Sequence, residues 1–280
     1  MNIFSTISDT VKTIDQFRNE GKAIGFVPTM GALHEGHLDL MRRAKKENDI
    51  LVVSIFVNPI QFNNPDDLKK YPRDLEKDKK SLEEINCNLL FTPDVDEMYP
   101  DVVDYKYDFG KLENVMEGAF RSGHFNGVAI VVKKLFDIIG PDKAYFGEKD
   151  YQQLAIIKKL VEMENIPVQI VPCPTIREKD GLAMSSRNER LTAEERAIAP
   201  FIFQALNDAK SHISEMVPGE IKFRLQNQFA DQPQFELEYF EIADDRELQP
   251  VINWNQAPGI RGFLAVQLGN VRLIDNIRFI

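Results

Sequence analysis

The sequence predicts an α/β fold: a doubly wound parallel sheet, followed by a smaller C-terminal α+β domain. Over most of the chain, apolar runs of strand length alternate with amphipathic helical stretches, which is the pattern of a parallel sheet covered by helices. Near residue 177 the order changes to helices first and strands afterwards. The length of 280 residues is sufficient for two domains, each with its own core.

The first strand–helix–strand unit lies near the N-terminus. Residues 10–20 read as an amphipathic helix that ends at Gly21, and residues 23–28 read as a buried strand. Residues 36–47 have the apolar spacing of a helix, and residues 50–57 (ILVVSIFV) are a β-branched run of strand length. Two strands joined by a helix pair in parallel, so this unit predicts a parallel sheet.

The same alternation continues and then stops. Further helices are expected at 73–86, within 123–140 and at 150–163, and further strands at 88–93, 143–147 and 168–173. Beyond them we expect helices at 192–215 and 219–230, then strands at 235–243, 262–268 and 271–277. We therefore expect a first domain of residues 1–176 and a second of residues 177–280.

The composition excludes two classes of partner. The formal net charge is −10, and an acidic chain binds nucleic acid or an anionic membrane poorly, because phosphate groups reward clustered Lys and Arg. The two cysteines, Cys87 and Cys173, make no disulfide framework. The sequence has no leader pattern and no apolar stretch of membrane-spanning length. We therefore expect a cytoplasmic protein with neither nucleic acid nor membrane as partner.

The segment 28–37 (PTMGALHEGH) holds two of the four histidines in the chain. It follows the first strand, at the sheet edge where open α/β sheets bind ligands. Gly31 and Gly36 let the backbone approach a ligand closely, and the N-terminus of the next helix offers N–H groups that attract phosphate. His34 and His37 could donate to its oxygens. A metal site with His124 as a third ligand and a turn with two surface histidines stay open as alternatives.

Compact polar groups also follow other predicted strands. Asn58 and Gln61 lie just after one strand, and Lys149, Asp150 and Gln153 lie just after another. A further group, 184–188 (MSSRN), follows the last strand of the first domain. Each group alone could be a helix cap, a turn or a surface charge. Together with the histidine pair they favour a nucleotide site.

Seven stretches make the chain similar to a known family over nearly its whole length. They are VPTMGALHEGH, SIFVNPIQF, YPRDLEKD, EGAFRSGHFNGV, FGEKDYQQL, DGLAMSSRN and RLIDN. In this order and spacing they resemble the pantoate–β-alanine ligases (pantothenate synthetases), which have a Rossmann-like fold and belong to the HIGH-type nucleotidyltransferases. HEGH resembles the HIGH element, and MSSR resembles the mobile KMSKS-type loop.

The resemblance implies a reaction and its partners. ATP, pantoate and β-alanine would give pantothenate, AMP and pyrophosphate through a pantoyl adenylate, with Mg²⁺ required. A homodimer is implied as well. The second domain would act as a lid whose loop, residues 185–187, closes over ATP and shields the adenylate from water.

The resemblance also implies roles at matching positions. His34 and His37 would stabilise charge on the triphosphate as pyrophosphate leaves, and Lys149 would neutralise the α-phosphate, so these three are the expected catalytic residues. The other residues expected to bind ATP are Met30, Gly147, Asp150, Ile176, Met184, Ser185, Ser186 and Arg187. Those expected to bind pantoate or β-alanine are Gln61, Gln153, Asn58, Met30, Phe56, Val131 and Val132. For the two valines a purely structural place in a helix core is an equal alternative.

The expected metal ligand is Asp78, at a family position associated with magnesium. The preceding position, often acidic in relatives, is Lys77 here, so ATP oxygens and water would complete the coordination. Two other functions remain open. One is a HIGH-type nucleotidyltransferase acting on another acceptor, although Gln61 and Gln153 suit a hydroxy acid better than a phosphorylated one. The other is a metal-binding module without enzymatic activity.

Overall fold

The structure, a computed structural model, describes residues 1–63 and 65–280 of the chain. Its contacts divide it into two compact units. The first comprises Met1–Phe109, Arg121–Glu148 and Ile156–Pro174, and the second comprises Gly110–Phe120, Lys149–Ala155 and Thr175–Ile280. The last segment of the second unit begins at Thr175, and the domain boundary after residue 176 stays a prediction. The two short segments of the second unit that precede Thr175 were not anticipated from the sequence.

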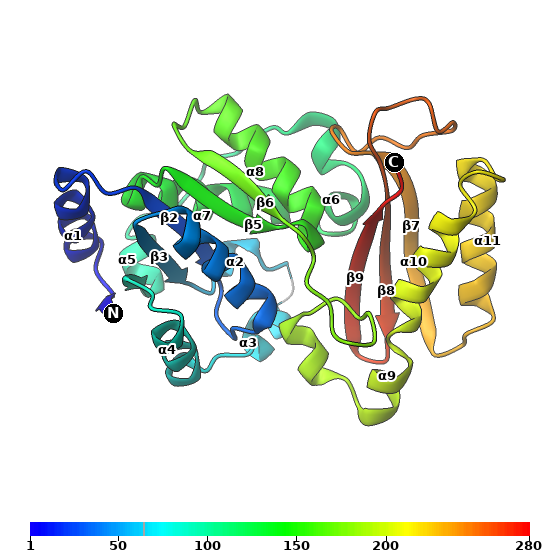
Figure 1. Cartoon of the computed structure of the whole chain (residues 1–280), viewed down its shortest axis with the longest axis horizontal. Coiled ribbons are helices and arrows are strands. Elements are labelled where there is room, and N and C mark those ends of the chain that lie inside the picture. The colour runs from blue at the N-terminus through cyan, green and yellow to red at the C-terminus, as the bar shows by residue number, and fades with distance from the viewer. Residues whose placement is uncertain (64) are drawn as a thin grey trace. The chain divides into compact units, whose positions relative to one another are not determined.

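Six parallel strands form the sheet of the first unit (Figure 1). They run in the order β1-β4-β3-β2-β5-β6. Their bounds are β1 Asn2–Phe4, β2 Ile24–Thr29, β3 Ile50–Ile55, β4 Leu89–Phe91, β5 Lys143–Gly147 and β6 Gln169–Cys173. The order reverses on either side of β2, which pairs with both β3 and β5. The predicted doubly wound parallel sheet is therefore confirmed, and its switch point lies between β2 and β5.

Helices cover both faces of this sheet, which explains why β2 is apolar at consecutive positions. Phe26 packs edge-on against Phe136 of α7, with ring centroids 6.3 Å apart. Its neighbour Val27 points the other way, into a cluster with Met41 of α2 and Leu82 of α4. A strand buried on both faces reads as a continuous apolar run. The helices are α1 Ile7–Asn19, α2 Glu35–Glu47, α4 Leu75–Glu84, α7 His124–Ile139 and α8 Tyr151–Met163.

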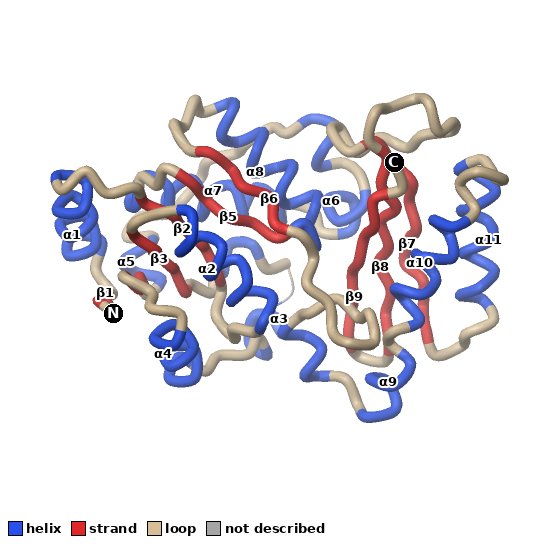
Figure 2. Tube along the Cα trace, viewed as in Figure 1, coloured by secondary structure: helices blue, strands red, loops and turns tan. Residues whose placement is uncertain are grey.

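The second unit contains an antiparallel sheet of β7 Phe235–Asp244, β8 Ile260–Leu268 and β9 Val271–Arg278 (Figure 2). Helices α10 Phe201–Ser211 and α11 Pro218–Ala230 pack on it and enclose a core with Leu206, Leu225 and Leu264. This is the α+β arrangement that the sequence predicts.

The observed elements differ from the predicted ones in three respects. The helix expected at 192–215 is two helices, α9 Ala193–Ile198 and α10, because Pro200 lies between them and cannot donate a backbone hydrogen bond. Strand β1 was not predicted, since three residues are too few for a pattern. The loop regions hold short additional helices: α3 Pro65–Lys70, α5 Val95–Met98 and α6 Met116–Phe120. No helix in the described part of the chain has both the length and the apolar character of a membrane span.

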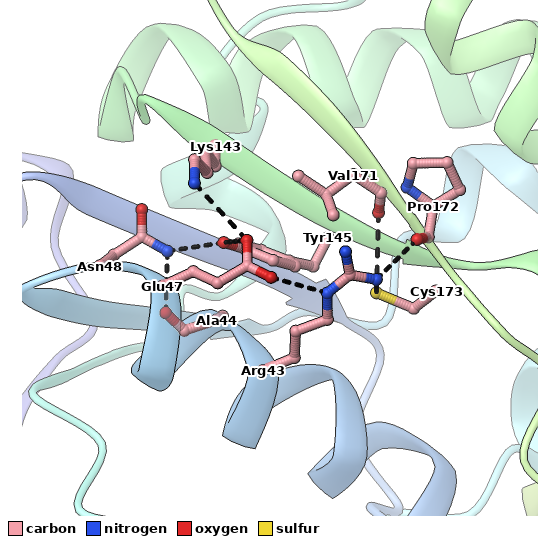
Figure 3. Close-up of polar contacts among 9 residues, drawn as sticks. All are labelled: Arg43, Ala44, Glu47, Asn48, Lys143, Tyr145, Val171, Pro172 and Cys173. Carbon is pink, nitrogen blue, oxygen red and sulfur yellow. Dashed lines mark hydrogen bonds and ion pairs between the residues drawn. The ribbon is translucent and has the colours of Figure 1, made fainter.

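The C-terminal half of α2 is fastened to β5 and β6 by a polar network (Figure 3). Arg43 donates to the Pro172 carbonyl at 2.9 Å and to the Glu47 carboxylate at 2.9 Å. Glu47 also accepts from the Tyr145 hydroxyl at 3.0 Å. The Arg43 guanidinium is the main reason why the pKa of Glu47 lies below its usual range. This network fixes the axis of α2 relative to the sheet, and thus the place of its N-terminus.

Both thiols of the first unit are inaccessible. Cys87 and Cys173 are buried, and burial raises the pKa of the Cys87 thiol to about 12. Because the thiolate is the reactive form, we expect neither thiol of the native protein to react with a disulfide reagent at pH 8 within an hour. Both should react at once in denaturant. Rapid release of one equivalent of chromophore from native protein would contradict this prediction.

Candidate active site

The loop after β2 makes a left-handed bend before α2 begins. Gly31 and Ala32 have φ values of 87° and 50°, a region that costs a residue with a Cβ about 1–2 kcal/mol. The bend directs the N–H groups of Ala32 and Leu33 toward the carboxylate of Asp78, which accepts them at 3.0 and 2.8 Å. Asp78 comes from the first turn of α4 and is 1% exposed. A buried carboxylate therefore holds the segment that leads to the histidine pair.

The structure brings His34 and His37 together as the cap of α2. His34 is the N-cap residue, and its Nδ1 accepts the N–H of Gly36 at 3.1 Å. The Nδ1 of His37 accepts the N–H of His34 at 3.4 Å. A ring nitrogen that accepts from an N–H carries no proton, so the neutral rings are protonated at Nε2. The ring centroids are 4.0 Å apart. The cap thus supplies two neighbouring Nε2–H donors at the carboxyl end of β2.

A cluster of amides lies after β3. Asn58 donates to the side-chain oxygen of Gln61 at 3.2 Å and to the carbonyl of Gly127 at 3.1 Å. The Gln61 amide nitrogen lies 3.0 Å from the sulfur of Met30. Both amides are buried, Asn58 completely. Three of the predicted substrate-binding residues, Met30, Asn58 and Gln61, are therefore in contact within one unit.

Two further side chains extend this amide cluster. Tyr99 donates its hydroxyl to Asn58 at 3.0 Å, and its ring lies 6.0 Å from the ring of Phe56. Burial raises the pKa of Tyr99 above its usual value, which keeps the hydroxyl a donor. His124 lies 2.8 Å from the Gln61 carbonyl, and a carbonyl only accepts, so Nδ1 of His124 carries the proton. From the sequence, His124 was a candidate only for the metal-site alternative.

The second unit holds the predicted lysine. Lys149 lies in a 3-10 turn, Glu148–Asp150, and its Nζ is 3.7 Å from the Asp150 carboxylate. The backbone carbonyl of Lys149 accepts the side-chain amide of Asn276 at 2.8 Å. The Asn276 oxygen in turn accepts from Arg261 at 2.7 Å. A buried asparagine of β9 thus fixes the turn that carries Lys149.

The predicted ATP loop is also built on β9. Residues 176–184 form a narrow hairpin, in which the N–H of Met184 donates to the Ile176 carbonyl at 3.0 Å. Arg177 donates to both carboxylate oxygens of Asp275, at 2.6 and 2.9 Å. After the hairpin, the Ser185 hydroxyl accepts the N–H of Arg187 at 3.2 Å and caps a short 3-10 helix, Ser186–Arg190. Two consecutive residues, Asp275 and Asn276, therefore hold both predicted ATP segments of this unit.

The remaining predicted residues have simple surroundings. Val131 and Val132 are buried in α7 at 6% and 5% exposure, as the core alternative expects as well. Gln153 is half-buried in the first turn of α8. A Cβ added at Gly147 would meet no atom of residues 1–63 and 65–280 within 4 Å, which is compatible with a bulky neighbour there.

Four residues that organise these clusters were not predicted from the sequence. Asp275 and Asn276 lie in the RLIDN stretch, to which no role had been given. Gly127 had a signal that could have been used, because glycine is unfavourable inside a helix unless something packs closely. A Cβ there would lie 2.7 Å from the Cα of Gln61. Tyr99 offered no signal, since nothing in its neighbourhood forms a pattern.

The surroundings of Asp78 do not fit a magnesium ligand. Both of its oxygens accept backbone N–H groups, and its side chain has almost no exposure. Burial also raises the pKa of Asp78, although the N–H groups of Leu33 and Ala32 oppose this rise. Among the side chains that the structure describes, no three of His, Cys, Asp or Glu are grouped so that they could hold a metal ion. The metal-binding alternative with His34, His37 and His124 has no support in this geometry either.

Comparisons with known proteins cover the whole chain. The family profile described as Pantoate-beta-alanine ligase matches residues 2–278. Pantothenate synthetases of Bacteroides fragilis and Porphyromonas gingivalis are each 48% identical over 279 residues, with 100% of this chain and 99% of each relative covered.

Solved structures agree with this result. The crystal structure of pantothenate synthetase from Thermus thermophilus has a TM-score of 0.93 and 41% identity, and covers 100% of this chain and 99% of its own. The Francisella tularensis pantoate-beta-alanine ligase, complexed with beta-gamma ATP and beta-alanine, has a TM-score of 0.83 and 38% identity, covering 100% and 98%. Profile, relatives and structures therefore agree, and this chain belongs to the pantoate–β-alanine ligase family.

Proposed function

We propose that the protein condenses pantoate with β-alanine at the expense of ATP. A carboxylate oxygen of pantoate attacks the α-phosphorus of ATP, and the bond to the β-phosphate breaks to release pyrophosphate. The amine of β-alanine then attacks the acyl carbon of pantoyl adenylate, loses a proton, and AMP leaves. The observation that carries the proposal is the histidine cap of α2, because its two Nε2–H groups are preorganised donors for a polyanion.

On the nucleotide side, each predicted group has a physical role. His34 and His37 donate their Nε2–H groups to triphosphate oxygens, and Lys149 supplies a positive charge near the α-phosphate, where negative charge builds up. Arg187 suits a forked contact with the β- and γ-phosphates, aided by Ser185 and Ser186. Asp150 accepts from the ribose hydroxyls. Met30, Gly147, Ile176 and Met184 border the nucleoside.

On the acid side, the amide cluster suits a hydroxy acid. Gln61 and Gln153 can each donate to a carboxylate and accept from a hydroxyl, which a charged side chain cannot do. The Gln61 amide is already oriented by Asn58. Met30, Phe56, Val131 and Val132 supply apolar contacts for the methyl groups of pantoate. Because the Gln61 amide is buried and hydrogen-bonded, it stays in place before the acid binds.

Isotope exchange between pyrophosphate and ATP tests this function. We expect exchange that depends on pantoate and does not need β-alanine, because adenylation precedes the second substrate. Exchange that requires a phosphorylated acceptor instead would favour a nucleotidyltransferase of another specificity. Stoichiometric zinc in the purified protein, without any ATP-dependent product, would favour the metal-binding alternative.

Asn276→Asp is expected to slow adenylation by loosening the turn of Lys149. The variant keeps an acceptor for Arg261 but loses the amide that donates to the Lys149 carbonyl. Loss of such a part-buried hydrogen bond costs about 0.5–1.5 kcal/mol of folding free energy. Displacing Lys149 by a fraction of an ångström should lower kcat for exchange by roughly tenfold, in line with the sensitivity of phosphoryl transfer to positioning. Thermal unfolding and exchange kinetics measure both effects.

A matched control distinguishes displacement of Lys149 from a general loss of stability of the antiparallel sheet. Gln267 is an amide of the neighbouring strand that donates to the Gly269 carbonyl near the surface. We expect Gln267→Glu to leave kcat unchanged. An equal loss in both variants would show that Asn276 acts only through stability.

Four expectations remain to be tested directly. The homodimer is testable by light scattering and the cytoplasmic location by fractionation. Lid closure requires crystals with and without an ATP analogue, and an unchanged loop at 185–187 would contradict it. A requirement for Mg²⁺ follows from the resemblance and from the usual form of ATP. When bound, the ion would neutralise phosphate charge, and the chain's own residues would act beside it.

A further inference from the structure

Asp78 is a buried carboxylate that no step of the proposed reaction uses directly. It comes from α4, where Asp74 is the N-cap residue and Lys77 lies beside it. Its side chain crosses to the loop after β2, which lies more than forty positions earlier in the sequence. Burying a carboxylate is costly unless donors compensate it, so its partners indicate what it does.

Those partners form an anion-binding nest. Successive backbone N–H groups can converge in a turn conformation, and such concavities bind anions. Here Gly31 and Ala32 both have positive φ, and the N–H groups that converge are those of Ala32 and Leu33. In this chain the anion is part of the protein itself, the carboxylate of Asp78.

The nest is closely packed around the carboxylate. A Cβ on Gly31 would lie 3.2 Å from an Asp78 oxygen and 3.1 Å from a methyl group of Ile55. The φ of 87° favours glycine at this position, and a Cβ would require Ile55 or Asp78 to shift by a few tenths of an ångström. The segment that Asp78 binds leads directly to His34, the N-cap residue of α2.

We propose that Asp78 is a positioning residue, which acts by filling the nest at Ala32 and Leu33 and so fixing where the imidazoles of His34 and His37 stand. Asp78 itself touches neither substrate nor metal. This inference rests on the proposed function for its kinetic consequence, but its structural part does not. It also explains why a lysine can occupy position 77. A carboxylate that binds backbone amides needs no acidic neighbour to complete a metal site.

The test compares Asp78→Asn, Asp78→Ala and a control, Asp74→Asn, in the full-length protein. The control removes one negative charge from the same helix and retains an N-cap, because asparagine caps as well as aspartate. Three quantities are measured for each: amide hydrogen exchange at Ala32 and Leu33 by NMR, kcat for pantoate-dependent pyrophosphate exchange, and the Mg²⁺ concentration that gives half-maximal rate.

The expected results differ between a positioning residue and a metal ligand. In Asp78→Asn and Asp78→Ala, exchange at both amides should accelerate by about tenfold or more, kcat should fall by about 10²-fold, and half-saturating Mg²⁺ should stay at the wild-type value. The control should match wild type in all three. A rise in half-saturating Mg²⁺, with activity recovered by excess Mg²⁺, would overturn the inference in favour of a metal ligand.

Two further outcomes keep the inference separate from the proposed function and from folding failure. If wild-type protein shows no pantoate-dependent exchange, the proposed function fails, and the amide exchange still decides whether Asp78 holds the nest. If the Asp78 variants do not fold, the wild type alone is informative. Unprotected amides at Ala32 and Leu33 in wild type would overturn the inference, because bonded amides must exchange slowly.

Discussion

Lys149→Ala is expected to lower the rate of pantoyl-adenylate formation by about 10²- to 10³-fold, the usual cost of removing one preorganised group that stabilises a transition state. Little of this loss should come from reduced stability. The ammonium of Lys149 is held by an ion pair with Asp150 that spans 3.7 Å. A pair of this kind contributes at most about 1 kcal/mol to stability. The melting temperature should therefore change little, while the rate of pyrophosphate exchange should fall steeply.

A lysine on the helix that follows this turn provides the control. Lys158 is an exposed residue of α8, so Lys158→Ala removes an equal charge without touching the predicted site. We expect this variant to catalyse pyrophosphate exchange at the wild-type rate. Near-normal turnover by Lys149→Ala would refute the role given to Lys149, whereas loss in both variants would point to a general effect of net charge.

His34→Ala is expected to remove two functions at once. The Nε2–H donor disappears, which should lower adenylation by about 10²-fold or more. The Nδ1 acceptor for the N–H of Gly36 disappears as well, and loss of an N-cap side chain costs about 0.5–2 kcal/mol. The variant should thus be both inactive and measurably less stable, as judged from exchange kinetics and chemical denaturation.

His34→Asn separates the two functions. Asparagine is among the best N-cap residues, so its side chain can accept from the start of α2 in place of the imidazole. It has no group that reaches where Nε2–H stands. We expect wild-type stability with the same kinetic loss as in His34→Ala. Activity retained in the asparagine variant would mean that His34 serves the helix and not the reaction.

The long, strongly patterned elements were predictable because burial on both sheet faces leaves an apolar run. Residues 143–147 were predicted as a strand and form β5 over the same span. The predictions failed where the pattern was short or interrupted. Strand β1 spans only Asn2–Phe4, and the helix break at Pro200 was hidden inside a continuous helical stretch. The association of Lys149–Ala155 with the second unit depends on contacts far apart in sequence, which no local pattern reports.

The candidate site divides in the same way. Residues whose types suit the predicted chemistry, such as His34 and Lys149, could be proposed from the sequence because they follow predicted strands. Side chains that hydrogen-bond to the backbone of another segment were not predicted in that role. Asn276 donates to the backbone carbonyl of Lys149, and Asp78 accepts two backbone amides. Such partners are selected by geometry and not by side-chain identity, so the sequence alone gives little indication of them.

Gly127 reverses a common rule of protein engineering. Exchanging an interior helix glycine for alanine ordinarily raises stability by about 1 kcal/mol, which makes α7 an obvious target for thermostabilisation. Here the added methyl group would meet the main chain of the neighbouring turn at 2.7 Å, and a main chain cannot step aside as a flexible side chain can. Engineering that optimises helix propensity should therefore retain glycine at position 127.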